Sequence, residues 1–403
     1  MSSLVVNLGI LGFFKYFNFF IHNFQQAFSL LGQDFPYYTL NIILPVGISF
    51  YTFQTLSYTI DIYRNRLKPS KNFTNFAVYV SFFPQLVAGP IERAVNLLPQ
   101  FKKSRSIGEK DISEGLRQIL WGLFKKMVIA DNCAEYVNLA FANPEAHSGS
   151  TLILGLILFA FQIYGDFSGY SDIAIGTARL FGFKLMQNFA FPYFSRDIAE
   201  FWRRWHISLT TWFRDYVYIP LGGSRGTKVN QIRNIFLIFL LSGFWHGANW
   251  TFLIWGGLNA IFFIPLLIKK RNRKHLNGIA IGRIFPSFSE LGHISLTFLL
   301  ICFTWIFFRA KNVQEAVNFI DVILQKGIAE MPHLDTIMST KMLTLLLILM
   351  LSVEWFNREN SFALEDLEKK VPRFLRWSFY SVILFTVGMY MYTEETPFIY
   401  FQF

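Results

Sequence analysis

Charged residues are scarce in this chain. They make up 16% of its 403 residues, while 53% are hydrophobic; an average soluble domain is about 25% charged. A soluble protein of this size could not cover so much apolar surface with so few charges. The same composition excludes a disordered chain, a collagen and a disulfide-bonded scaffold. We therefore expect an all-α polytopic membrane protein.

Cysteine is nearly missing, since the sequence holds 2, Cys133 and Cys302. They stand far apart in apolar helical surroundings and fit no disulfide or metal-binding pattern, so we expect core thiols. Repeats of fixed period, low-complexity tracts and an appended soluble module are also missing. We expect a single membrane domain over residues 1–403, with a polar core at 164–255.

Apolar runs long enough to cross a bilayer, which takes about 20 residues, recur along the sequence. We place them near 3–22, 39–60, 114–141, 151–178, 290–308, 341–356 and 375–393. Two further regions are broken by Pro and Gly and are expected to be hairpins or re-entrant segments: 73–96 and 232–268. Such breaks at membrane depth require shielding by protein or water, so they point to function. The first run has no basic leader, so we expect no cleavable signal peptide.

The charge that is present is mostly positive and is placed in short loops. Lys and Arg number 37 against 26 Asp and Glu, a formal net charge of +11. Loop clusters of this kind orient membrane proteins with the basic side in the cytoplasm, which makes nucleic-acid binding a poor explanation. We expect the basic loops 64–71, 102–110 and 269–275 to be cytoplasmic. Linkers 33–38 and 143–150 lack Lys and Arg and, with 309–340, are expected outside.

The polar core begins with Tyr164–Asp172, in the middle of an otherwise apolar run. An ionised Asp at a membrane helix centre costs about 2.5–3.5 kcal/mol. Asp166 and Asp172 should therefore face the protein interior and have partners. A functional site and a structural set of buried hydrogen bonds explain these residues equally well.

The next part of the core, Arg196–Arg225, is amphipathic. Arg203 and Arg204 supply cations, and the tryptophans beside them suit a membrane interface. From the residues alone, an interfacial helix anchored by aromatic and arginine side chains is the favoured interpretation.

The last part of the core holds His246, within the glycine-containing turn Gly243–Asn249. A histidine at membrane depth is a functional candidate, and imidazole titrates near neutral pH, as a general base should. His206 and His246 are too far apart for a helical metal pair and have no Cys or carboxylate cluster nearby, so no metal is expected. The residues alone leave an enzyme and a small-molecule transporter open.

Several separated motifs resemble the membrane-bound O-acyltransferase family, and most closely its bacterial alginate O-acetyltransferase branch. They are Pro45–Gln54, Tyr58–Arg64, Gly89–Ile91, Tyr164–Asp172, Arg196–Arg225, Gly243–Gly247 and Pro397–Phe403. Members of this branch usually have one or two more hydrophobic segments before the position that matches Leu4, so the amino end is expected to be short by that much.

The resemblance implies about nine to eleven transmembrane or re-entrant helices around a central funnel or tunnel. It assigns His246 as the catalytic histidine and His206 as the second histidine of the site. It also places Asp166, Arg203, Arg204 and Asn249 in matching motifs, as candidate substrate-binding residues.

The implied reaction moves an acyl group, expected to be acetyl from acetyl-CoA, from a cytoplasmic thioester toward hydroxyls of an exported polysaccharide such as alginate. No bound cofactor is expected. The sequence has no Gly-x-Ser-x-Gly elbow, so an extracytoplasmic acetyltransferase partner is expected to finish delivery. The expected location is the bacterial inner membrane. D-alanyl transfer to teichoic acid is a close alternative, and a transporter is the alternative from another class.

Overall fold

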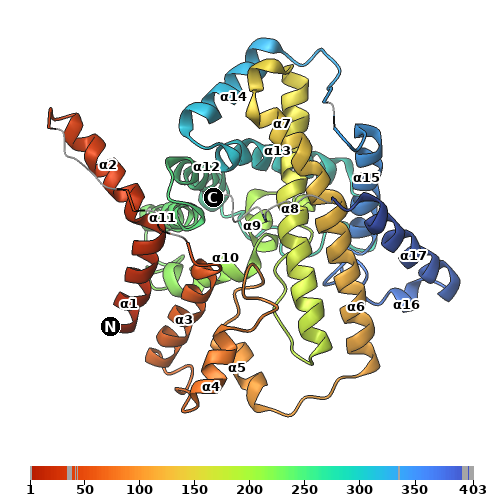
Figure 1. Cartoon of the computed structure of the whole chain (residues 1–403), viewed down its shortest axis with the longest axis horizontal. Helices are drawn as coiled ribbons and strands as arrows, with labels where there is room; N and C mark the ends of the chain where they lie inside the picture. Colours follow the sequence, from red (N-terminus) through yellow and green to blue (C-terminus); the bar gives the residue numbers. More distant parts are fainter. Residues whose placement is uncertain are drawn as a thin grey trace.

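The computed structural model describes residues 2–33, 39–40, 42, 44–334, 336–392 and 398. Throughout these ranges the chain forms helices, turns and loops, without a β-strand. The view in Figure 1 shows a broad helical body, with the first helices at one side and the last ones at the other. The all-α expectation is therefore confirmed.

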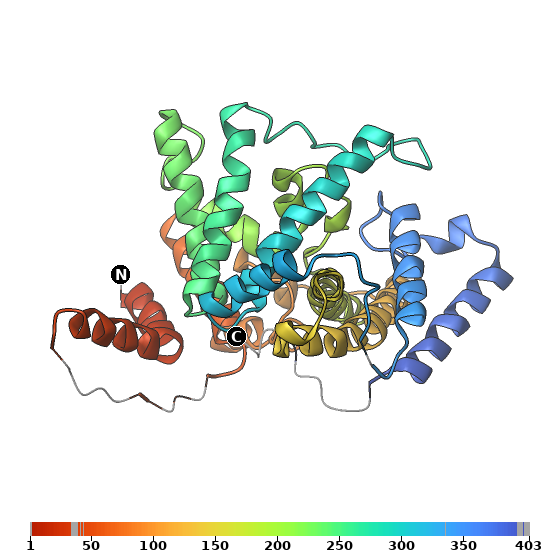
Figure 2. The same ribbon diagram turned by 90° about the horizontal axis from the view of Figure 1, so that it is seen from above.

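The amino-terminal helices stand at the edge of the body. One continuous helix is made of α1 (Ser2–Leu11), the π-helical η1 (Gly12–Tyr16) and α2 (Phe17–Ser29). Its α2 end points away from the other helices in Figures 1 and 2. Next to α1 lies α3 (Ile48–Tyr63), which begins later than the predicted start at residue 39. Part of the difference, residues 41 and 43, lies outside the described residues.

The predicted break at 73–96 is present as two short helices. These are α4 (Phe73–Val80) and α5 (Ala94–Lys102), joined by a turn-rich segment that contains Pro84 and Gly89. Proline has no backbone N–H and forces its neighbours out of the helix, which explains the interruption. Most of the turn's residues are buried, so protein shields the non-helical backbone.

Two long helical rods form the centre. One is α6 (Glu109–Leu123), continued by the π-helical η2 (Phe124–Ala130) and α7 (Asp131–Ala142). The other is α8 (Gly149–Leu180), reached through the short η3 (Pro144–Ala146). The rods run side by side in Figure 1. Their backbones touch at glycines: a Cβ on Gly122 would lie 2.6 Å from the carbonyl oxygen of Gly169. Small residues at such contacts let membrane helices approach closely.

The Arg196–Arg225 stretch does not form the interfacial helix that the residues alone favoured. It folds into the short helices α9 (Ile198–Arg204), α10 (Ile207–Phe213) and η5 (Arg214–Tyr218), after η4 (Pro192–Phe194). Its tryptophans are buried, because they stack against neighbouring helices rather than facing lipid headgroups; they are Trp202, Trp205 and Trp212.

A helical hairpin follows, as predicted for 232–268. Helix α11 (Lys228–His246) and helix α12 (Trp250–Ile268) are joined by a three-residue turn. The remaining helices are α13 (Phe288–Arg309), α14 (Val313–Lys326), α15 (Thr340–Phe356), α16 (Leu367–Lys370) and α17 (Arg373–Tyr390). The last three predicted spans fall on α13, α15 and α17, although α17 ends at Tyr390, before the predicted end at 393. Residue 393 itself lies outside the described residues.

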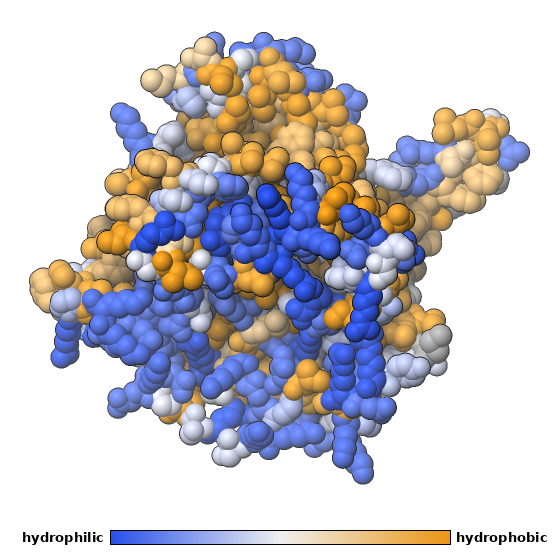
Figure 3. Space-filling view, turned by 180° about the vertical axis from the view of Figure 1, so that it is seen from behind, coloured by the Kyte–Doolittle hydropathy of each residue, from blue (hydrophilic) through white to orange (hydrophobic). Residues whose placement is uncertain are grey.

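Within the described residues, four helices are long and apolar enough to cross a membrane. They are Ser2–Ser29, Gly149–Leu180, Trp250–Ile268 and Phe288–Arg309. Figure 3 shows hydrophobic side chains over the upper part of one face and hydrophilic ones over its centre and lower part. Large apolar side chains on the surface are unfavourable when they face water, but not when they face the hydrocarbon of a bilayer. The chain is a polytopic helical membrane protein.

Candidate active site

His206 lies at the break between α9 and α10, in a strained backbone conformation. Its φ is +42° and its ψ is +55°, the left-handed region that residues other than glycine rarely adopt. Such strain persists where the surroundings over-determine it, and it gathers at functional sites. Only 1% of His206 is exposed. Its ring packs edge-on against the Phe167 ring, with 4.5 Å between the ring centres.

The His206 ring is held by Asn188, a residue that sequence reasoning missed. The Asn188 Oδ1 lies 3.1 Å from His206 Nδ1 and also accepts a hydrogen bond from Ser208 Oγ at 2.8 Å. Asn188 Nδ2 donates to Ser171 Oγ at 3.0 Å, which ties the loop to α8. Because an amide oxygen only accepts, His206 Nδ1 must carry the proton in this contact when the ring is neutral. The other nitrogen, Nε2, is buried with no hydrogen bond among the described residues.

His246 is the last residue of α11 and lies in an aromatic enclosure. Its ring centre is 4.9 Å from that of Trp245 and 5.2 Å from those of Trp255 and Phe308. The hairpin that carries it is tight: a Cβ on Gly243 would lie 2.1 Å from the Phe252 carbonyl oxygen. The helix-breaking turn predicted from the glycines therefore fixes the imidazole between two packed helices.

The fold brings the two predicted histidines to one cavity of ≈ 60 Å³. The other residues around it are mostly apolar: Trp202, Trp205, Leu209, Thr210, Phe213, Ile238, Phe239 and Ser242. His246 also borders a second cavity of ≈ 250 Å³, together with Lys15, Leu44–Phe50, Val87 and Trp245. The imidazole of His246 thus lies between two cavities formed by different helices.

Lys15 is a second residue that sequence reasoning missed. Its Nζ donates to the backbone carbonyl oxygens of Trp245, at 2.7 Å, and His246, at 3.0 Å. It thereby caps the carboxyl end of α11, where carbonyl groups lack helical partners and carry partial negative charge. A lone cation inside an apolar run was a readable signal in the sequence, because charged residues at membrane depth gather at functional sites. The structure adds that Lys15 lies in a π-helical turn, another feature that is frequent at functional sites.

Asp166 forms an ion pair between the two central rods. Its carboxylate is 2.7 Å from Lys126 Nζ, which also pairs with Asp131 at the same distance. Asp172 pairs in the same way with Lys125 at 2.7 Å. Asp166 is absent from the linings of both cavities at His246. These contacts join α8 to η2, and a substrate-binding role for Asp166 stays a prediction.

The other predicted substrate-binding residues surround the site without lining these two cavities. Arg203 donates to the carbonyl oxygens of Asn272 and His275, so it anchors the loop after α12. Arg204 pairs with Glu200 at 2.9 Å.

Asn249 supports the hairpin that carries His246. Its side chain accepts from the Thr251 N–H, capping α12, and donates to the Lys311 carbonyl oxygen at 2.6 Å. These contacts give Asn249, like Arg203 and Arg204, a structural task in the described residues. Their part in binding substrate stays a prediction.

Comparison with known proteins adds the family. The sequence profile of the membrane-bound O-acyltransferase family matches residues 63–277. A probable alginate O-acetylase of Pseudomonas aeruginosa is 39% identical over 371 residues, which are 92% of this chain and 69% of that protein. A peptidoglycan O-acetyltransferase of Helicobacter pylori is 37% identical, covering 83% of this chain and 66% of that protein.

A more distant relative is a teichoic acid D-alanyltransferase of Bacillus subtilis, 29% identical over 67% of this chain and 70% of that protein. The chain spans about two thirds of the length of these relatives. The profile match and the extent of the first similarity show that the chain belongs to the membrane-bound O-acyltransferase family and is, as the motifs predicted, an acyltransferase.

Proposed function

We propose that this protein moves an acetyl group from acetyl-CoA, on the cytoplasmic side, toward hydroxyl groups of an exported polysaccharide such as alginate. The observation that carries the proposal is the position of His246, which shares one cavity with His206 and borders a second cavity beside Lys15. A donor and an acceptor that enter from different sides need such a shared point. The relatives named for alginate and peptidoglycan O-acetylation support the choice of acyl group and acceptor.

In the proposed step, His246 is the general base. Its imidazole takes the proton of an attacking hydroxyl, the hydroxyl oxygen bonds to the thioester carbonyl carbon, and the C–S bond breaks. The proton then passes from His246 to the leaving thiolate, so the products are an ester and a free thiol. Proton transfer by a positioned side chain contributes typically about 10²–10⁴-fold in rate.

His206 is proposed to orient the reacting groups. Its Nδ1 is engaged by Asn188, and its buried Nε2 belongs to a ring that lines the ≈ 60 Å³ cavity with His246. The apolar walls of this cavity suit the acyl end of a thioester better than a sugar. We therefore assign the donor to this cavity and the acceptor hydroxyl to the cavity beside Lys15.

The proposal includes the location, the membrane orientation and the partner of the protein. The bacterial inner membrane is the proposed location, with loops 64–71, 102–110 and 269–275 in the cytoplasm, where their basic residues would attract the polyanionic donor. An extracytoplasmic acetyltransferase is the proposed partner for delivery to the polymer. One membrane domain over residues 1–403, with its catalytic core at 164–255, is proposed to perform the transmembrane step.

D-alanyl transfer to teichoic acid is the second candidate, favoured by the similarity to the Bacillus subtilis enzyme. It would use a thioester on a carrier protein in place of a small donor. Turnover of labelled acetyl-CoA by purified membranes supports the first candidate. Turnover of carrier-bound D-alanine alone would support the second.

The decisive experiment is His246→Ala. We expect this variant to insert and fold but to lose acetyl transfer by at least about 10²-fold, the lower range for a general base. His147→Ala, in the loop at 143–150, is the matched control and should retain activity. Full transfer by His246→Ala would refute the proposal, and solute uptake by the wild type without any transfer would favour a transporter.

A further inference from the structure

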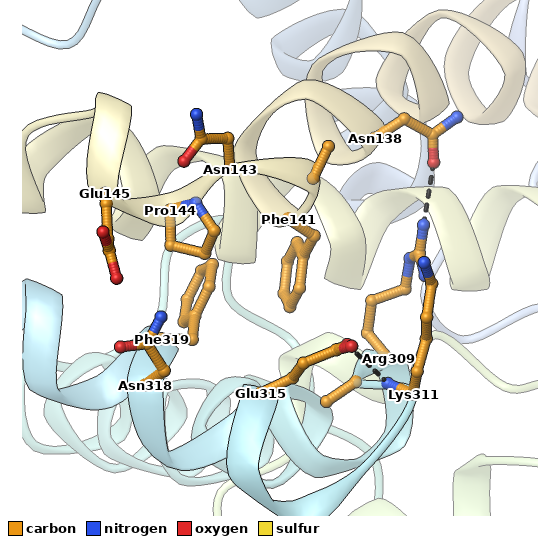
Figure 4. Close-up of a pocket in the computed structure, with 12 residues that line it drawn as sticks. Asn138, Phe141, Asn143, Pro144, Glu145, Arg309, Lys311, Glu315, Asn318 and Phe319 are labelled. Atoms are coloured by element: carbon orange, nitrogen blue, oxygen red, sulfur yellow. Dashed lines mark hydrogen bonds between the residues drawn. The ribbon is translucent and has the colours of Figure 1, made fainter.

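A third cavity, of ≈ 560 Å³, lies between the end of α7 and the start of α14 and has no task in the reaction above. It is larger than either cavity at His246. Figure 4 shows its lining side chains on two facing walls, one from α7 and η3 and the other from the α13–α14 junction and α14. Its volume lies within the range of about 300–1,000 Å³ typical of small-molecule sites.

The walls of this α7–α14 cavity are polar and balanced in charge. They carry three amides, two cations and two carboxylates: Asn138, Asn143, Asn318, Arg309, Lys311, Glu145 and Glu315. Sugar hydroxyls donate and accept hydrogen bonds at once, and amide side chains can satisfy both functions. An acyl chain would strip water from these polar groups without replacing it. The lining therefore fits a polyhydroxylated ligand.

Some lining side chains of the α7–α14 cavity are held by other residues, and some are not. The Arg309 guanidinium donates to Asn138 Oδ1 at 2.9 Å and lies 5.6 Å from the Phe141 ring centre. That ring stacks on Phe319 at 4.2 Å, so the floor of the cavity is packed before any ligand arrives. The side-chain amides of Asn143 and Asn318, in contrast, make no hydrogen bond with other described residues.

The cavity adjoins the turn that carries His246. Arg309 directly follows Phe308, whose ring lies 5.2 Å from the His246 ring. Asn249, three residues after His246, donates to the Lys311 carbonyl oxygen at 2.6 Å. Linker 143–150 and stretch 309–340, which contribute to the two walls, are both expected on the side opposite the basic loops, where an exported acceptor would be found.

We propose that the α7–α14 cavity is a carbohydrate-binding subsite that holds a segment of the polysaccharide near the His246 turn. Its identity as an acceptor subsite rests on the proposed function; its binding of a glycan does not. The subsite would hold the polymer on the outer side of the membrane domain, where the proposed partner acetyltransferase completes delivery to its hydroxyl groups.

The test is direct binding of two soluble probes, a mannuronic acid tetrasaccharide and an N-acetylglucosamine tetrasaccharide, to the full chain in detergent micelles. We expect at least one probe to bind the wild type. The double variant Asn143→Ala/Asn318→Ala should weaken that binding about tenfold, because it removes two side-chain hydrogen-bonding groups. Asn318→Trp, which narrows the cavity and removes one amide, should also weaken it.

The matched control is Asn277→Ala, an exposed asparagine on the loop between α12 and α13, which should bind as the wild type does. His246→Ala should also bind the probe normally. Unchanged thermal unfolding of each variant shows that it is folded. Failure of the wild type to bind either probe, or equal affinity of the wild type and both cavity variants, would overturn the subsite. Full acetyl transfer by His246→Ala would refute the reaction instead and leave glycan binding standing.

Discussion

At the residue scale, the chemistry of the candidate site depends on how each imidazole is held. Asn188 holds His206 through Nδ1, and Lys15 holds the carboxyl end of α11 on which His246 stands. A base or an orienting group must be held in one geometry to act, since small misplacements of reacting atoms cost large factors in rate. Asn188 and Lys15 can therefore affect the reaction rate without contacting a substrate.

Asn188→Ala is expected to lower kcat for acetyl transfer about fivefold, the effect of losing a buried hydrogen bond worth roughly 1 kcal/mol. The KM for the donor should change little, because Asn188 lines neither cavity at His246. Steady-state kinetics on purified membranes measure both values. Asn188→Asp, which keeps the accepting oxygen, is the control and should recover part of the loss.

A structural role alone would show a different pattern for Asn188. If Asn188→Ala and Asn188→Asp lowered the amount of folded protein equally and left kcat per folded molecule unchanged, the positioning role would be wrong.

At the element scale, the position of His246 depends on how closely α11 and α12 pack. Glycines on facing sides let the two backbones meet: a Cβ on Gly256 would lie 2.3 Å from the Phe239 carbonyl oxygen. The next residue, Gly257, points elsewhere, and a Cβ there would lie 4.0 Å from Leu240 Cδ2, an ordinary van der Waals contact. Comparing the same substitution at Gly256 and at Gly257 therefore distinguishes the effect of close helix packing from the effect of adding a methyl group to α12.

Gly256→Ala is expected to destabilise the protein by about 1–3 kcal/mol, the usual cost of overpacking, because a backbone carbonyl cannot move aside as a side chain can. Activity should fall as well, since α11 ends at His246. Gly257→Ala is the matched control and should keep stability and activity near the wild type. Thermal unfolding in detergent, followed by tryptophan fluorescence, measures the difference; equal unfolding temperatures would contradict the packing argument.

At the scale of the whole molecule, the proposed reaction requires two sides of a membrane. The basic loops 64–71, 102–110 and 269–275 define one proposed side, and the linker at 143–150 defines the other. Labelling can distinguish these sides, because the two native cysteines, Cys133 and Cys302, are 0% and 3% exposed and give little background.

Single cysteines at exposed positions test the sidedness in intact cells with a membrane-impermeant maleimide. Ala146→Cys is expected to react from outside. Lys103→Cys and Arg273→Cys should react only after the membrane is permeabilised, because positive loops stay in the cytoplasm. Labelling of Lys103→Cys in intact cells would overturn the orientation.

The family and the helical membrane architecture were readable from the sequence, as were the break at 73–96 and the hairpin around His246. Apolar run length, glycine and proline act over a few neighbouring residues, and such local signals need no knowledge of the packing. The exception is Arg196–Arg225, whose amphipathic pattern predicted an interfacial helix. Its aromatic side chains found partners inside the protein instead, which sequence periodicity does not record.

Only the tertiary structure decided which distant residues meet. It placed His206 beside His246, joined His206 to Asn188, and brought Lys15 from the first helix to the end of α11. It also gave Asp166 a partner in Lys126. The physical reason is that buried polar groups must find hydrogen-bond or ionic partners wherever the packing places them. The sequence names the groups that need partners, and the packing of the helices selects the partners.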